Sequence, residues 1–246
     1  MATTIERRAT VRLMATDLPF VFKRVPRRRH IHFLINEAGE LELRAPWRFG
    51  LESAQAILRE NEARVLGLLE KARRRQSLRP SLITGTPLPL LDRSLFLDVH
   101  PSPFSTSAKR RPARVERRGD RLWVSVPAPE DQELLRKALE KWYRGQGKVH
   151  FAERIEHYSP QLRVPEPTLS IRGQRSRWGS CSTSGRVSLN WRLMMAPTAL
   201  SDYVVVHELC HLRYMNHSPS FWSLVESIVP DYRLRRRKLN ALQFPL

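Results

Sequence analysis

The chain has 246 residues, which is enough for one large or two modest domains, each with a buried core. Its apolar share of 41% is ordinary for a globular protein and argues against wholesale disorder, and no apolar run approaches the roughly 18 residues of a membrane span. With 43 basic and 24 acidic residues, the formal charge is +19, which favours contact with polyanions such as nucleic acid or nucleotides.

The basic residues lie in separate clusters and form no motif that reads DNA bases, so a solvated basic surface explains the charge as well as polyanion binding does. The N-terminus lacks the apolar core of a signal peptide. Cys181 and Cys210 are the only cysteines, and two reduced, buried thiols suit a cytosolic chain better than one disulfide. We therefore expect a soluble, cytoplasmic protein without membrane contact.

Residues 1–126 are predicted to form a β-rich module wrapped around one helix. Runs rich in β-branched and aromatic residues, some with alternating polarity, indicate strands. These strands are expected at 21–25, 30–36, 41–45, 94–99, 114–117 and 121–126. Apolar residues at helical spacing from Ala54 to Ala72 predict the helix. Pro127 and Pro129 interrupt the β pattern, and the domain boundary is placed there.

Residues 127–246 are predicted to form the second domain, which opens with a long helix over about 130–157. Strands are then expected at 168–171, 176–181 and 186–191. The next helix, from Thr198 to about Tyr214, is apolar on nearly every side, which is typical of a helix inside a core. Two further helices follow, one capped by Ser218 and a basic one capped by Asp231.

The apolar helix carries His207-Glu208-Leu209-Cys210-His211, and His217 follows beyond its end. His207 and His211 are four residues apart, so a helix projects both imidazoles from one face, one turn apart. Two neutral imidazoles at that spacing can hold one zinc ion, with Glu208 close enough to reach a water on the metal. A reversing chain could return His217 to the same ion, and three imidazoles would leave a fourth position for water, as in catalytic zinc sites.

Other readings of the motif are open. The two helical histidines could be satisfied core residues, but Glu208 between them would then need its own partner in an apolar setting. The third ligand could also be a carboxylate from a later helix, either Glu226 or Asp231. We favour His217, because Asp231 is explained as a helix cap and Glu226 as a solvent-facing residue.

Further stretches accompany this motif. They are Arg177-Trp178-Gly179-Ser180-Cys181, Leu189-Asn190-Trp191-Arg192-Leu193, Ala196-Pro197, Tyr203 to Leu212, Asn216-His217-Ser218 and Phe221-Trp222. Together they resemble the YgjP-like branch of the SprT-like zinc metallopeptidases, over about residues 128–239, and the N-terminal part resembles that family more loosely. The ligand spacing also matches the metzincins, but Tyr214 occupies their turn glycine and no Met-turn follows, so that membership is not implied.

The resemblance implies an α+β protein whose C-terminal domain is zincin-like: a long helix, a small β-sheet and the H-E-x-x-H helix. It implies one zinc ion held by His207, His211 and His217, and a metal-bound water activated by Glu208 that hydrolyses a peptide or unfolded protein. The hairpin Arg177–Asn190 would supply the edge strand along which the substrate lies. Expected substrate contacts are Arg177, Trp178, Asn190 and Tyr214.

Some of these roles have rivals. A packing role explains Trp178 at least as well as a place in a substrate groove. The candidates for stabilising the oxyanion, which the sequence does not rank, are Tyr203, Tyr214, Asn190 and Arg177.

Two other functions use the same residues. Arginines crowd the β block beside the metal helix, at positions 172, 175, 177, 186 and 192. A zinc site lined by guanidinium groups could hydrolyse a phosphoanhydride, for example by releasing pyrophosphate from a nucleotide. In the third hypothesis the protein binds nucleic acid and its zinc is structural, but a structural site has no need of Glu208.

Overall fold

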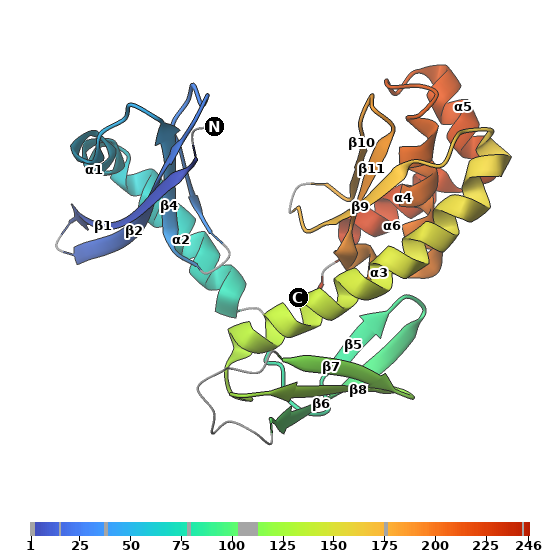
Figure 1. Ribbon diagram of the computed structural model, residues 1–246, viewed down its shortest axis with the longest axis horizontal. Coiled ribbons are helices and arrows are strands. Elements are labelled where there is room, and N and C mark those ends of the chain that lie inside the picture. Colours follow the sequence, from blue (N-terminus) through green and yellow to red (C-terminus); the bar gives the residue numbers. More distant parts are fainter. Residues whose placement is uncertain are drawn as a thin grey trace. The chain divides into compact units, whose positions relative to one another are not determined.

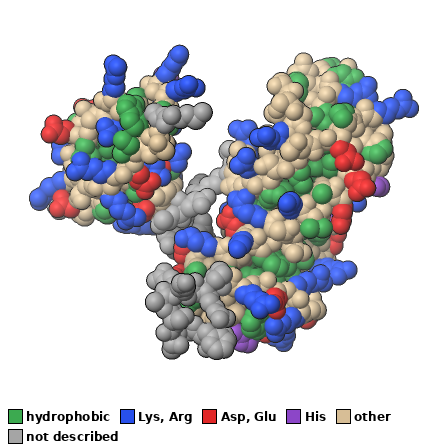
Figure 2. All heavy atoms as spheres, in the orientation of Figure 1, with side chains coloured by type: hydrophobic (Ala, Val, Ile, Leu, Met, Phe, Trp, Pro, Cys, Tyr) green, Lys and Arg blue, Asp and Glu red, His purple; other side chains and the backbone are tan. Residues whose placement is uncertain are grey.

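The computed structural model describes residues 3–14, 16–36, 39–77, 80–102, 113–174, 177–242 and 244–246 (Figure 1). The chain divides into two compact units, Met1–Pro80 and Ser81–Leu246. The fold is mixed α+β, as predicted. Within the described ranges, none of the helices has the length and apolar character that a membrane crossing requires. On the face drawn in Figure 2, Lys and Arg side chains are spread over many elements rather than gathered on one.

The first unit is a sheet with two helices. Its elements are β1 (Ile5–Leu13), β2 (Thr16–Val25), β3 (His32–Ile35), β4 (Leu41–Pro46), α1 (Leu51–Glu60) and α2 (Glu62–Ser77). The strands lie in the order β1-β2-β4-β3, with β2 and β4 parallel and the other pairs antiparallel. The predicted single helix is in fact two, because Asn61 ends α1 and turns its side-chain amide back to the carbonyl of Ile57, 2.9 Å away.

The strand β1 was not predicted. Its residues are mostly charged or exposed, and only Val11 and Leu13 are buried, so the apolar pattern that marks a strand is weak. Pairing with β2 along the whole strand, from Ile5 opposite Arg24 to Leu13 opposite Thr16, supplies the missing stabilisation. A strand defined by its partner rather than by its own pattern is hard to recognise from local sequence.

The second unit opens with a sheet in the order β5-β6-β8-β7 and the long helix α3 (Figure 1). These elements are β5 (Pro87–Leu90), β6 (Arg93–Pro101), β7 (Arg114–Arg118), β8 (Arg121–Val126) and α3 (Gln132–Leu162). Buried residues of the sheet, such as Leu97 and Val124, share one core with Leu139 and Tyr143 of α3. The division of the chain therefore falls at Pro80–Ser81, whereas the sequence placed it at 126–127. The prolines that suggested that boundary lie in the link between β8 and α3.

The remainder of the unit holds a small sheet and the apolar helix. Its elements are β9 (Thr168–Arg172), β10 (Gly179–Cys181), β11 (Arg186–Asn190), a 3-10 turn at Trp191–Met195, α4 (Thr198–Cys210), α5 (Pro219–Ile228) and α6 (Tyr232–Ala241). The sheet order is β10-β11-β9, which leaves β10 at an edge. The strand predicted from residue 176 begins at Gly179, and residues 175 and 176 lie outside the described ranges. Helix α4 ends at Cys210, four residues before the predicted Tyr214.

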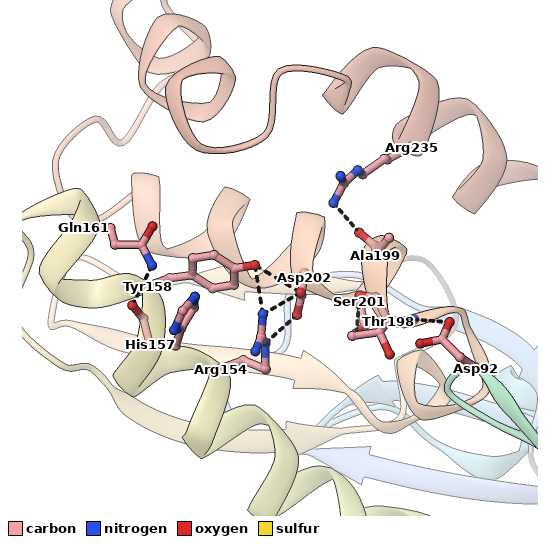
Figure 3. Close-up of polar contacts among 10 residues, drawn as sticks. All are labelled: Asp92, Arg154, His157, Tyr158, Gln161, Thr198, Ala199, Ser201, Asp202 and Arg235. Carbon is pink, nitrogen blue, oxygen red and sulfur yellow. Dashed lines mark hydrogen bonds and ion pairs between the residues drawn. The ribbon is translucent and has the colours of Figure 1, made fainter.

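Helix α4 is held at its N-terminal end by two polar contacts (Figure 3). Asp92, from the turn between β5 and β6, accepts a hydrogen bond from the backbone nitrogen of Thr198 at 3.1 Å. The carboxylate of Asp202 accepts hydrogen bonds from Nε and Nη2 of Arg154, both at 2.7 Å, and from the hydroxyl of Tyr158 at 3.0 Å. Because Arg154 and Tyr158 belong to α3, this cluster locks the two helices together in register.

Candidate metal centre

Three imidazoles meet at the C-terminal end of α4. The nearest ring nitrogens of His207, His211 and His217 all lie within 4.8 Å of one another. His207 is in the last turn of α4, and His211 directly follows the helix with a helical backbone (φ −66°, ψ −18°). His217 precedes Ser218, whose hydroxyl caps α5 by accepting from the nitrogen of Phe221 at 3.4 Å. The end of α4 and the start of α5 therefore bring the three histidines, the first and last of which are ten sequence positions apart, to one point.

The carboxylates considered as alternative ligands lie elsewhere. Among the described residues, neither Glu226 nor Asp231 belongs to the group that could share one ion. Glu226 is exposed on α5. Asp231 stands at the start of α6, as predicted, but its carboxylate makes no capping hydrogen bond and is paired with Arg235 at 2.8 Å.

The geometry of the ring nitrogens suits a bound metal ion. Nε2 of His207 and Nε2 of His217 are 3.2 Å apart, close to the separation of about 3.3 Å expected for two nitrogens that bind the same tetrahedral ion. Nδ1 of His211 lies 3.0 Å from the carbonyl oxygen of Tyr214. A hydrogen bond donated by Nδ1–H to this oxygen would leave the lone pair of Nε2 available to a metal ion. Burial, with the charges of the neighbouring rings, lowers the pKa of His207 to about 3 and keeps its imidazole neutral, as a ligand must be.

Aromatic residues of α5 hold two of the imidazoles in place. The ring of Phe221 is fully buried and stacks on His211, with centroids 4.6 Å apart. Trp222 stacks on His217 at 5.4 Å and an interplanar angle of 24°. Phe221 and Trp222 therefore form a wall of the histidine cluster.

Glu208 is buried between α4 and the edge strand β10. Its exposed fraction is 5%, and burial raises the pKa of its carboxyl to about 8 against the opposing charge of Arg177. Gly179 of β10 lies directly against it, since a methyl group on that Cα would be 2.5 Å from Oε1 and 2.6 Å from Cγ of Glu208. Only a glycine leaves space for this carboxylate. A glycine inside a predicted strand is a signal for such a close approach, but it does not say what approaches.

The residues predicted to contact substrate have different surroundings. Trp178 is half-buried and meets Phe244 edge to face at 5.3 Å, so packing accounts for much of its surface. Asn190 is buried, and its amide donates to the carbonyls of Gln174 and Arg177 at 2.6 and 3.1 Å. Asn190 thus holds the loop that leads into β10.

Of the other two predicted contacts, Tyr214 and Arg177, only Tyr214 touches a histidine. Tyr214 contributes its backbone carbonyl to His211, whereas its ring lies 5.8 Å from the guanidinium of Arg213. Arg177 is exposed just before β10. Of the oxyanion candidates, Tyr203 is buried with its ring 5.9 Å from that of His207.

Both cysteines are free. Cys210 is fully buried, and burial raises the pKa of its thiol to about 12. Cys181 of β10 is half-buried, and burial together with the charge of Glu208 raises the pKa of its thiol to about 11. The expectation of two reduced, buried thiols therefore holds for Cys210, whereas Cys181 is only half-buried.

A protein-family model described as "YgjP-like, metallopeptidase domain" matches residues 29–242. The chain belongs to the YgjP-like family. This match begins inside the first compact unit, so the YgjP-like region includes β3, β4 and both helices of that unit as well as the histidine cluster. None of the curated proteins matches the chain. Among solved structures, it is similar to the metallopeptidase zymogen abylysin of Pyrococcus abyssi, with 26% identity over 38% of this chain and 96% of that one, at a TM-score of 0.35.

Proposed function

We propose that this metallopeptidase depends on zinc, which His207, His211 and His217 hold, and that Glu208 serves as the general base in peptide-bond hydrolysis. The observation that carries the proposal is the convergence of three imidazoles at the end of α4, next in sequence to a buried glutamate. Membership of a metallopeptidase family supports it. We assign the machinery to residues 127–246 and expect a zincin-like layout there, with α4 behind the edge strand β10.

The donor set favours zinc. Imidazole nitrogens suit zinc among the common biological metals, and three protein ligands with an open fourth position are typical of catalytic rather than structural zinc. When bound, such an ion supplies Lewis acidity, which lowers the pKa of a coordinated water and polarises a carbonyl oxygen. A cation held by the histidines would also favour the charged form of Glu208, opposing the effect of burial.

The protein groups then perform two tasks. The free edge of β10 offers backbone hydrogen bonds to an extended peptide, which would place a scissile carbonyl beside the histidines. An oxygen of Glu208 accepts the proton of the attacking water while the new C–O bond forms. The same carboxyl group then gives that proton to the leaving nitrogen as the C–N bond breaks. Burial excludes bulk water and holds the carboxylate in one position.

The test compares the wild type with Glu208→Gln, His217→Ala and a chelated sample on fluorogenic unstructured proteins. The control is Glu226→Gln, the same chemical change at an exposed glutamate of α5. Glu208→Gln should retain zinc and lose about 10²- to 10⁴-fold in kcat. His217→Ala should bind zinc weakly, zinc should restore the chelated enzyme, and Glu226→Gln should match the wild type.

Certain results would reject the proposal. They are full activity of Glu208→Gln, the absence of any zinc affinity, or loss of zinc binding in Glu226→Gln. Nucleoside triphosphates are included as substrates, because the cationic charge of Arg177 acts at Glu208 and would suit a phosphoanhydride too. Triphosphate hydrolysis that needs Glu208, without peptide cleavage, would select that function instead.

A further inference from the structure

The last helix places an arginine at the histidine cluster. The guanidinium of Arg236, on α6, lies 5.7 Å from the ring centroid of Trp222. Trp222 stacks on His217 at 5.4 Å and on Tyr232 at 5.1 Å, with interplanar angles of 24° and 15°. An aromatic stack therefore links the arginine to the outermost of the three imidazoles. A guanidinium over an aromatic ring is both attracted and restricted in its motion.

The ring that Arg236 contacts borders two of the imidazoles. The centroid of Trp222 lies 5.4 Å from that of His217 and 5.8 Å from that of His207. The guanidinium of Arg236 is therefore held against a ring that forms part of the wall of the histidine cluster.

Two other arginines of α6, Arg233 and Arg235, are engaged within the chain, whereas Arg236 is available. Arg235 pairs with Asp231 at 2.8 Å and donates to the carbonyl of Ala199 at 3.0 Å. Arg233 donates to the hydroxyl of Tyr232 at 3.1 Å. Arg236 is exposed, and across the described ranges no carboxylate lies within 4.0 Å of it. The N–H groups of the Arg236 guanidinium are therefore available to donate hydrogen bonds to a bound partner.

A second cation stands on the strand side of the site. Arg177 is exposed and stands two residues before Gly179, the residue of β10 that lies directly against Glu208. The site is thus bordered by one guanidinium beside the edge strand and another beside α5. A substrate with negative charge near the scissile bond would gain on both sides, and the overall charge of +19 would attract it from solution.

We propose that Arg236 is a specificity-determining residue that binds a carboxylate side chain of the substrate, so that this peptidase cleaves acidic polypeptide segments. The proposal rests on the peptidase function proposed above. A guanidinium can form two parallel hydrogen bonds with one carboxylate, and the contact with Trp222 keeps that of Arg236 beside the histidine cluster. An uncharged amide in place of the carboxylate loses most of this interaction.

The experiment uses the full-length zinc-loaded protein and a matched peptide set. Each peptide differs from a neutral parent by one Glu, Gln or Lys, placed in turn at positions on either side of the cleaved bond. The variants are Arg236→Lys, Arg236→Gln and Arg236→Glu, and the control is Arg237→Glu, the same charge reversal at the next exposed residue of α6. Zinc content and circular dichroism establish that each variant is folded.

At one position the wild type should prefer Glu over Gln by about tenfold or more in kcat/KM, the size of a charge-assisted hydrogen bond. Arg236→Lys should keep part of this ratio, Arg236→Gln should abolish it, and Arg236→Glu should favour Lys instead. Arg237→Glu should retain the wild-type ratio.

An unchanged Glu/Gln ratio in Arg236→Glu overturns the inference, and so does an equal loss in Arg237→Glu, which would indicate a general field rather than a contact. A change confined to triphosphate hydrolysis also overturns it. The peptidase function is judged separately, because cleavage of the neutral parent peptide must depend on Glu208 whatever the preference at Arg236.

Discussion

The close approach of β10 to Glu208 makes Gly179→Ala an informative substitution. The added methyl carbon would lie 2.5 to 2.7 Å from Oε1, Cγ and Cδ of Glu208, whereas carbon atoms in favourable contact are about 3.5 to 4.0 Å apart. The overlap is thus about 1 Å at several atoms. The backbone at Gly179 is not left-handed, so alanine meets no conformational barrier there. Either the carboxylate turns away or the edge strand moves.

These two responses cost little in stability and much in activity. Turning a side chain out of its rotamer costs about 0.5–1.5 kcal/mol, and overfilling a packed core costs about 1–3 kcal/mol. A shift of about 1 Å in a reacting group, by contrast, can reduce a rate about 10²-fold. We therefore expect Gly179→Ala to lose about 100-fold in kcat/KM while the free energy of unfolding falls by only about 1–3 kcal/mol.

The assays are peptide cleavage, zinc content and chemical unfolding, measured on the same preparation. Gly145→Ala is the matched control, because its methyl group on α3 would meet nothing within 4 Å; it should leave activity unchanged and stabilise the helix by about 0.4–1 kcal/mol. Wild-type activity in Gly179→Ala would refute the idea that this strand positions Glu208. Loss of zinc with loss of activity would refute it as well, since the effect would then reach the ligands rather than the base.

Two further substitutions test contacts outside the site. Asp202→Asn should lower the free energy of unfolding by about 1–3 kcal/mol, because it leaves the half-buried guanidinium of Arg154 without its carboxylate. A loss under about 1 kcal/mol in urea titrations would show that α3 and α4 do not depend on this pair. In the first unit, burial raises the pKa of Glu42, but hydrogen bonds from Arg44 and Lys23 outweigh it and leave the pKa below the ordinary 4.5. Its stabilising effect is therefore complete above about pH 4.5 and lost as the pH falls through the folded value, and Glu42→Gln should flatten that acid dependence in hydrogen exchange of the first unit. If Glu42→Gln keeps the wild-type acid dependence, Glu42 is not the group responsible for it.

The proximity of the histidines could be predicted because most of it is local. His207 and His211 are four positions apart, and the helical period alone puts their rings on one face. Ser218 could be recognised as a helix cap from its type and the proline after it, and it confines His217 to the short joint between α4 and α5. In both cases the relevant interactions span less than a dozen residues.

The division of the chain could not be predicted in the same way. Prolines mark where a strand or helix stops, and Pro127 and Pro129 do stop β8 before α3 begins. Whether a stop is also a domain boundary depends on what packs across it. Here Leu97 and Val124 of the sheet share a core with α3, so the contacts that join the two sides outweigh the break in local pattern.

Asp202 shows how burial changes the meaning of a sequence signal. An acidic residue near the start of a helix is favoured by the helix dipole, and Asp202 is the fifth residue of α4. That effect is worth about 0.3–1 kcal/mol at exposed positions, whereas removing a carboxylate from water costs several kcal/mol. Asp202 is only 6% exposed, so the dipole cannot account for it, and a cation must be paired with it. The need for a partner follows from an apolar helix, but choosing Arg154 among 43 basic residues requires knowing that α3 lies against α4.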